Sequence, residues 1–342
     1  MEFQEQILNE YVAQARKIYP NLAYGTSVGS SFDDKVEFNF YNHQQVLHDT
    51  QYSPKSINKF IHYTSIDSLF SILNSKEIRL FNLNNLNDKT ELKYSANQFN
   101  LELNEHQLNH FRNSYFLHSF CQYDGNHLDD FNLWRLYGQN GSGVGIVFEI
   151  TNTSDKWYQM FLGQVNYDMS SESSARLIEF IQFHKSFCSN HNNFMQNIPT
   201  FILILLLFHK NSIWKIENEF RLLSHYEMES VGKGSSLIDS NCFFDNNLFH
   251  TITKNRSKTA YLTLPLSPLS EMDFAELRNA YDETQDKLFL KSIPSISITK
   301  VILGYDYSDK QLIEITELIH RICLEKAMRD INVEITHLIK QI

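Results

Sequence analysis

The sequence contains little glycine, proline or cysteine. Its 342 residues include 11 glycines, 6 prolines and 4 cysteines. So little glycine and proline excludes a collagen-like or low-complexity chain. The cysteines stand far apart, at Cys121, Cys188, Cys242 and Cys323. This spacing excludes a zinc knuckle and does not favour a disulfide framework.

The sequence also lacks a long apolar run. The most apolar segment, Phe201–Phe208, is far shorter than the ~20 residues that a membrane-spanning helix needs. The opening residues, MEFQEQILNE, show no basic segment followed by an apolar stretch, so no signal peptide is expected. We therefore expect a cytoplasmic protein with no membrane partner.

Acidic residues exceed basic ones, with 40 Asp and Glu against 30 Lys and Arg, which gives a net charge of −10. This balance argues against a surface that coats phosphates generally, because non-specific affinity for nucleic acid comes from Lys and Arg. It leaves room for a small basic cleft. The 26 Phe, 17 Tyr and 3 Trp residues supply enough apolar surface for a substantial core, which excludes a disordered chain.

Helical and strand patterns alternate irregularly, which predicts an α+β fold in place of a regular βαβ series. Helices are expected at 1–19, around 66–73, and at 90–111, 129–138, 171–212 and 309–328. Strands are expected at 36–41, 59–63, 78–81, 115–121, 144–150, 164–167, 219–226, 297–304 and 332–338, with one or two more within 251–264. We predict an N-terminal helical extension at residues 1–56 and one larger domain at residues 57–342.

Two aromatic segments carry candidate ligand-binding residues. His62, Tyr63 and Thr64 lie where a predicted strand meets a helix, so His62 can present a ring nitrogen to a cleft. An isolated histidine at such a place is more often a satisfied core residue. Trp134 and Tyr137 are three apart and share one helix face. Such a pair usually belongs to the core, but it can also form a stacking wall for a flat ring.

Polar side chains suggest two further sites, each with a simpler explanation. Asn87, Asp88 and Glu91 fit a turn followed by a helix cap, so structure alone explains them. His106 and His110 have a legal spacing for two metal ligands. Their segment is otherwise polar and lacks the glutamate of a zinc-protease helix, so a solvated helix face is expected and no metal is predicted.

A charged triplet offers the sharpest chemical candidate. Glu217, Glu219 and Arg221 alternate, so on a strand they share one face, while Phe220 and Leu222 occupy the apolar face. Two clustered carboxylates raise at least one pKa, and a nearby guanidinium lowers it again. Spacing does not say whether this charged face meets bulk water or a cleft.

The order of these motifs resembles the bacterial domain-of-unknown-function family 2971. The matching segments are His62-Tyr63-Thr64, Leu86-Asn87-Asp88 with Glu91, Ser119-Phe120-Cys121, Trp134 with Tyr137, Gly143–Phe148, Lys210 with Trp214, Glu217, Glu219 and Arg221, and Val301–Gly304. The resemblance covers residues 58–305. The chain departs from the family pattern at Lys89, where proline is frequent, and at Cys121, where serine is frequent.

That family in turn resembles the ADP-ribosyltransferase-like superfamily, which has a split β-sheet that clasps NAD. The resemblance implies a split β-sheet core with surrounding helices, a catalytic domain at 57–342, and NAD as substrate. It carries over catalytic roles to Glu219, Glu217 and His62, and NAD-binding roles to His62, Tyr63, Thr64, Asn87, Trp134, Tyr137 and Arg221. Arg221 would bind a pyrophosphate, and Glu219→Gln is expected to abolish transfer with stability nearly unchanged.

The resemblance implies a mono-ADP-ribosyltransferase that acts as a toxin-like effector, in a toxin–antitoxin pair or in anti-phage defence. The acceptor would be a protein or a nucleic acid, and a cognate antitoxin would be a partner. Two alternatives remain open. One is a Mg²⁺-dependent nuclease or phosphoesterase that uses Asp88, Glu91, Glu217 and Glu219. The other is a non-catalytic module that senses a nucleotide.

Overall fold

The computed structural model describes residues 2–22, 24–26, 38–40, 44–86, 90–125, 131–151, 157, 160–191, 199–226, 248–252, 258–267 and 293–338. Its helices are α1 (Glu2–Ile18), α2 (Ile66–Ser75), α3 (Glu91–Gln98), α4 (Glu105–Ser114), α5 (Phe131–Leu136), α6 (Glu172–Asn190), α7 (Thr200–Leu206) and α11 (Asp309–Glu325). Short 3₁₀ turns include η1 (Gln44–Leu47), η2 (Leu83–Asn85), η3 (Gln139–Gly141) and η4 (Ser212–Glu217). None of these helices is long and apolar enough to cross a membrane.

The strands are β1 (Tyr24–Thr26), β2 (Phe38–Phe40), β3 (Lys59–Thr64), β4 (Glu77–Asn82), β5 (Tyr115–Gln122), β6 (Val144–Thr151), β7 (Met160–Gln164), β8 (Glu219–His225), β9 (Leu248–Ile252), β10 (Lys258–Pro265), β11 (Ser295–Leu303) and β12 (Asn332–Ile335). Ten of them form one sheet in the order β12-β11-β6-β3-β5-β4-β10-β9, with β8 on β5 and β7 on β8. Only β11 and β12 pair in parallel among the described strands of this sheet. The expected α+β class is confirmed.

The sheet opens at the middle of β5. One edge of β5 pairs with β8 from Tyr115 to Cys121. The other edge is shared, because β3 pairs only at residues 121–122 of β5 and β4 pairs only at residues 116–117. Residues 118–120 therefore face a gap between β3 and β4.

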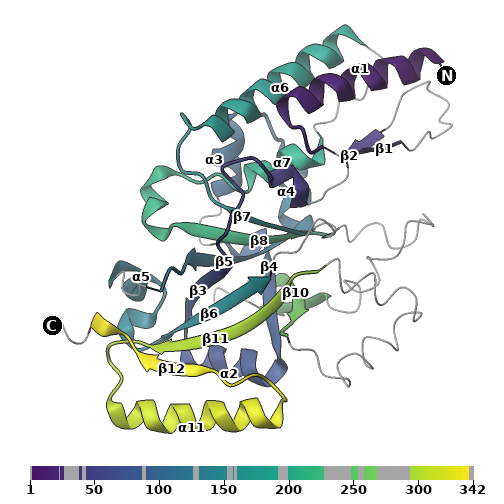
Figure 1. The fold of residues 1–342 in the computed structure, drawn as a ribbon. Helices are drawn as coiled ribbons and strands as arrows, with labels where there is room; N and C mark the ends of the chain where they lie inside the picture. Colours follow the sequence, from purple (N-terminus) through teal and green to yellow (C-terminus); the bar gives the residue numbers. More distant parts are fainter. Residues whose placement is uncertain are drawn as a thin grey trace, which may run out of the picture.

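Helices cover both faces of this sheet (Figure 1). Helices α2 and α11 pack on one face, where Leu69, Leu73, Ile319 and Ile322 join the apolar residues of β3, β4, β6 and β11. On the other face, α1, α3, α4, α6 and α7 form a helical layer over Leu117 of β5 and Leu223 of β8. Helix α5 covers a smaller area of that face beside β3 and β6. The gap lies between this helical layer and α5.

Three expected elements differ from the structure. The single helix expected at 90–111 is two helices, because Asn100 takes a left-handed φ of 53° and Asn104 starts α4 with a capping box. The helix expected at 171–212 ends at Asn190, and a second helix starts after Pro199. The strand expected at 164–167 lies earlier, at Met160–Gln164.

Helix α1 packs on the helical layer instead of standing apart from it. The Tyr11 hydroxyl lies 2.8 Å from Nδ1 of His184 on α6, and Tyr11 also stacks on Phe183. From the same N-terminal segment, the Tyr52 hydroxyl lies 2.5 Å from Nε2 of the buried His209. The division of the chain at residues 56 and 57 stays a prediction.

Candidate functional site

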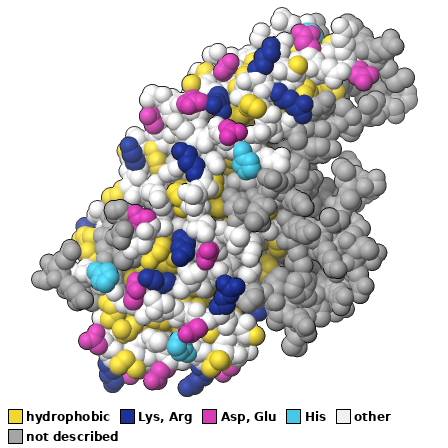
Figure 2. Space-filling view, in the orientation of Figure 1, with side chains coloured by type: hydrophobic (Ala, Val, Ile, Leu, Met, Phe, Trp, Pro, Cys, Tyr) yellow, Lys and Arg dark blue, Asp and Glu magenta, His cyan; other side chains and the backbone are white. Residues whose placement is uncertain are grey.

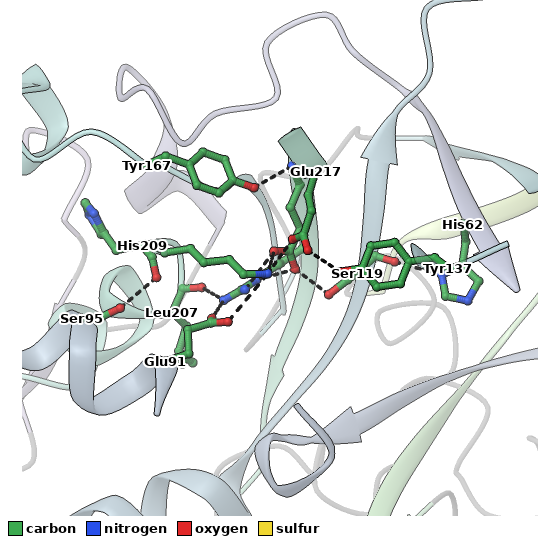
Figure 3. Close-up of polar contacts among 12 residues, drawn as sticks. His62, Glu91, Ser95, Ser119, Tyr137, Tyr167, Leu207, His209 and Glu217 are labelled. Atoms are coloured by element: carbon green, nitrogen blue, oxygen red, sulfur yellow. Dashed lines mark hydrogen bonds and ion pairs between the residues drawn. The ribbon is translucent and has the colours of Figure 1, made fainter. Parts of the chain in front are cut away.

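A cavity of about 300 Å³ occupies the gap in the sheet. Its walls come from β3, β4, β5, η2, α3, η4 and β8, and from Tyr137 and Lys210. Figure 3 shows the polar side chains that meet there. Segments far apart in the sequence thus contribute to one charged site.

Arg221 forms the base of the site. It is on β8 and is fully buried. Its Nε and Nη2 donate to Oε1 and Oε2 of Glu219 at 2.8 and 3.0 Å. Its Nη1 donates to Oε1 of Glu91 and to the carbonyl of Leu207, each at 2.5 Å. Because its nitrogens are committed to protein acceptors, the structure does not support the expected role of Arg221 as a pyrophosphate ligand.

Glu219 is held as a fixed negative charge. Oε1 accepts from Ser119 Oγ at 2.6 Å as well as from Arg221, and Oε2 accepts from Lys210 Nζ at 3.1 Å as well as from Arg221. Burial raises the pKa of Glu219. The charges of Arg221 and Lys210 and the hydrogen bonds lower it by more, so that the pKa is about 2. The carboxylate is therefore ionised and has both oxygens occupied.

Glu217 reaches the same cavity from a different element. The alternation with Glu219 predicts a place on the same strand, but Glu217 is the last residue of η4, and β8 begins only at Glu219. Asn218 lies between them with φ 40° and ψ 52°, a left-handed conformation that asparagine tolerates. This turn brings both carboxylates into one site. Oε1 of Glu217 accepts from the Tyr137 hydroxyl, and Oε2 accepts from Lys210 at 2.6 Å.

Three acidic residues share the two cations of the site. The Lys210 ammonium lies 2.6 Å from Glu217, 3.1 Å from Glu219 and 3.9 Å from Glu91. Arg221 also contacts Glu219 and Glu91. Burial raises the pKa of Glu91, and the Arg221 charge opposes this shift. The ionised Glu219 therefore supplies a fixed negative charge within a closely paired cluster.

Two neutral histidines line the gap from the opposite face of the sheet. Nδ1 of His62 lies 3.1 Å from the carbonyl of Ser119, and Nδ1 of His118 lies 2.9 Å from the carbonyl of Arg79. Burial lowers the pKa of both rings, to about 3 for His118, although the bond to Ser119 opposes the shift for His62. Because a carbonyl only accepts, each Nδ1 carries the proton and each Nε2 is an acceptor.

The structure brings some expected site residues together and places others elsewhere. His62, Tyr63, Tyr137, Glu217, Glu219 and Arg221 line the cavity. Trp134 does not: it is fully buried and packs edge-on against Tyr63, with 5.0 Å between ring centroids. Thr64 pairs with Val144 in the sheet and is also outside the lining. Asn87 and Asp88 lie outside the described residues.

Two residues of the cluster are not site residues in the leading interpretation of the sequence: Glu91 fits a helix cap, and Ser119 is only part of a family motif. Glu91 is buried at the start of α3, beside the core residue Leu92. No local pattern in the sequence pairs it with Arg221.

The acidic cluster does not resemble a metal site. The positions between its carboxylates are occupied by the ammonium of Lys210 and the guanidinium of Arg221. Within the described part of the chain, no group of three or more His, Cys, Asp or Glu side chains is arranged to hold a metal ion. This geometry gives the Mg²⁺-dependent alternative no support from Glu91, Glu217 or Glu219.

Comparison with known proteins gives one match. Residues 133–222 match the family described as "Protein of unknown function (DUF2971)". No curated protein and no solved structure matches the chain. The matched segment includes Tyr137, Lys210, Glu217, Glu219 and Arg221, so the family resemblance and most of the charged cluster coincide in one part of the sequence.

Proposed function

We propose that the chain is a NAD-dependent mono-ADP-ribosyltransferase. The observation that supports this most is the pair Glu217 and Glu219 in one cavity that Tyr137 and His62 also line. The nicotinamide ring of NAD is cationic, and cleavage of its bond to ribose leaves positive charge on the sugar, as in glycoside hydrolysis. Fixed carboxylates stabilise that charge as it develops.

The two carboxylates suit different roles. Glu219 has both oxygens occupied, so it acts as a fixed charge and accepts no proton. Glu217 has one contact at each oxygen, from Tyr137 and Lys210, which leaves lone pairs for an acceptor. In the proposed reaction the C–N bond of the ribose breaks and nicotinamide leaves. The acceptor nucleophile bonds to the ribose carbon, and its proton passes to Glu217.

The remaining cavity residues bind and orient. Tyr137 provides an aromatic wall, and burial together with its bond to Glu217 raises its pKa, so it stays protonated. The Nε2 of His62 can accept a hydrogen bond from a ribose hydroxyl. About 300 Å³ lies at the lower end of the range for ligand pockets, roughly 300–1,000 Å³. We therefore assign this cavity to the nicotinamide and its ribose.

The biological role is proposed from the family resemblance: a toxin-like effector in a toxin–antitoxin pair or in anti-phage defence. Its acceptor is then a nucleic acid or a protein, and expression alone should be toxic unless a cognate antitoxin is present. Loss of toxicity in a variant that binds NAD but does not turn it over would support an enzymatic cause.

Labelled NAD and cell extract provide the test. The wild type should release nicotinamide and transfer label, with the mass increment of ADP-ribose on an acceptor. Glu217→Gln should lower transfer by about 10²–10⁴-fold, the usual contribution of a general base. Glu149→Gln is the matched control, because Glu149 is on β6 and contacts Asn58 outside the cavity. EDTA should not affect the activity.

A folded wild type that neither consumes NAD nor transfers label would refute the proposal. Thermal stabilisation by NAD without turnover would support the non-catalytic sensing module instead. Loss of a phosphoesterase activity in EDTA would support the metal-dependent alternative.

A further inference from the structure

His118 has a buried ring nitrogen without a partner in the described part of the chain. The residue is on β5, is 8% exposed and lines the cavity. Its Nδ1 donates to the carbonyl of Arg79 on β4, whereas its Nε2 has no hydrogen-bond partner among the described residues. Most buried polar atoms of proteins are paired, because an unpaired one gives up its contact with water and gains nothing in return.

The His118 ring lies in the gap of the sheet. On one side its Nδ1 is 2.9 Å from the carbonyl of Arg79, and on the other its ring centroid is 4.4 Å from that of His62 on β3. The two nitrogens of an imidazole lie on opposite sides of the ring, so Nε2 points away from Arg79. It is therefore directed into the space between β3 and β4, where the cavity lies.

The surroundings of His118 favour a neutral donor on the ligand. Its ring centroid lies 4.6 Å from that of Phe120 and 6.2 Å from that of Phe148. Burial, and to a smaller extent His62, lower the pKa of His118 to about 3, so the ring is neutral and Nε2 is an acceptor. The apolar rings disfavour a charged group. An oxygen that only accepts cannot pair with Nε2, so the complementary group is a neutral N–H or O–H.

A second unpaired atom in the cavity favours a carboxamide as this group. Of the buried polar atoms without a partner in the described residues, two belong to side chains that line the cavity, Nε2 of His118 and Nε1 of Trp214. The first is an acceptor and the second is a donor. A carboxamide carries both a donor and an acceptor, whereas a hydroxyl offers a single proton.

Charge on the surface does not select the ligand. Figure 2 shows basic and acidic side chains interspersed over the described residues of one face. In the cavity, the cations of Lys210 and Arg221 are paired with carboxylates. The unpaired atoms of the cavity are therefore the groups that distinguish one neutral ring from another.

We propose that Nε2 of His118 accepts a hydrogen bond from a carboxamide N–H of the ligand and selects ligands that carry this donor. The identification of this carboxamide as that of the nicotinamide ring rests on the proposed function. His62 keeps its place beside the ribose hydroxyl. His118 determines specificity and takes no part in breaking the C–N bond.

Isothermal titration calorimetry with nicotinamide and 3-acetylpyridine, at about pH 7, tests the proposal. Both compounds are neutral and share the ring and the carbonyl, but 3-acetylpyridine has a methyl group in place of the NH₂. Neither contains the bond that the proposed reaction breaks, so binding is measured apart from turnover. The wild type should bind nicotinamide about tenfold more tightly, which corresponds to about 1.4 kcal/mol.

Two variants of His118 separate the hydrogen bond from the shape of the cavity. His118→Leu removes the acceptor and should bind the two compounds equally. His118→Gln keeps a hydrogen-bonding group if leucine is not tolerated in the fold. It should bind both compounds, because an amide can turn either its oxygen or its NH₂ to the ligand.

His225→Leu is the matched control, since His225 is buried on β8, stacks on Tyr115 and does not line the cavity. It should keep the preference for nicotinamide. Equal affinities in the wild type, binding of neither compound, or a preference that His118→Leu retains would overturn the proposal. Release of nicotinamide from NAD by a wild type without this preference would overturn the role of His118 alone. A preference for nicotinamide without any turnover of NAD would overturn the enzymatic function and leave the role of His118 standing.

Discussion

Replacing Arg221 by methionine should destabilise the protein strongly. Methionine keeps an unbranched, apolar stem in the fully buried position but removes the donors to Glu219, Glu91 and the carbonyl of Leu207. Breaking a buried ion pair by removing one partner costs about 3–5 kcal/mol, because it leaves buried charge without compensation. The fall in the pKa of Glu219 from 4.5 to about 2 corresponds to about 3 kcal/mol, to which Lys210 also contributes.

The loss should depend on pH with a defined sign. In the wild type, the folded-state pKa of Glu219 is below its unfolded value, so the stabilisation is present above about pH 4.3 and is lost as the pH falls toward 2. Arg221→Met removes the largest charge that opposes burial at Glu91 and Glu219, so we expect their folded-state pKa to rise above the unfolded value. The variant therefore gains stability relative to its neutral-pH value as the pH falls, and the difference from the wild type narrows near about pH 5.

Urea unfolding followed by tryptophan fluorescence, at about pH 7 and about pH 5, measures both effects. Arg321→Met is the control, because Arg321 is exposed on α11. Adding Glu91→Gln and Glu219→Gln to Arg221→Met should restore part of the lost stability by removing the uncompensated charges. A loss below about 1 kcal/mol, or an equal loss at both pH values, would refute the account of the cluster as a buried ionised network.

Two further predictions concern the surroundings of the site. Tyr52→Phe removes the contact of the Tyr52 hydroxyl with His209 at 2.5 Å and should lower the free energy of unfolding by about 1 kcal/mol, measured by urea titration; an unchanged midpoint would contradict it. Gly304→Ala places a Cβ about 2.0 Å from the carbonyl oxygen of Gly141 and should cost about 1–3 kcal/mol or more in a thermal melt. Gly125→Ala is the comparison for backbone strain without crowding, since no atom lies within 4 Å there but its left-handed φ of 83° disfavours a side chain by about 1–2 kcal/mol. A smaller loss for Gly304→Ala than for Gly125→Ala would argue against the close approach.

The cluster changes the expectation for one substitution. Glu219→Gln had been expected to leave stability nearly unchanged. Glu219 accepts two hydrogen bonds from the buried Arg221, so the amide would leave that guanidinium with less compensating charge. We now expect Glu219→Gln to reduce stability, and for this reason Glu217→Gln is the cleaner probe of the proposed chemistry.

Strongly patterned elements were predictable from the sequence. The helix at residues 1–19 and the strand at 219–226 agree with α1 and β8 to within one or two residues. The alternation on β8 correctly separates Phe220 and Leu222, which enter the core, from Glu219 and Arg221. These features follow from local periodicity, which the chain order contains directly.

The composition of the site depended on the tertiary structure. Glu91 and Arg221 are far apart in the sequence and meet because strand order brings α3 over β8. Trp134 and Tyr137 are three residues apart and are predicted on one helix face. In the structure, Trp134 is buried against Tyr63, whereas Tyr137 lines the cavity.

The sequence by itself determined the secondary structure class, the two faces of β8 and the acidic and aromatic residue types available for a site. Only the tertiary structure decided which charges pair and where the sheet opens. The physical reason is that a buried charge is stable only next to its partners, and the partners here are set by long-range strand pairing and by the left-handed turn at Asn218, not by neighbours in the chain.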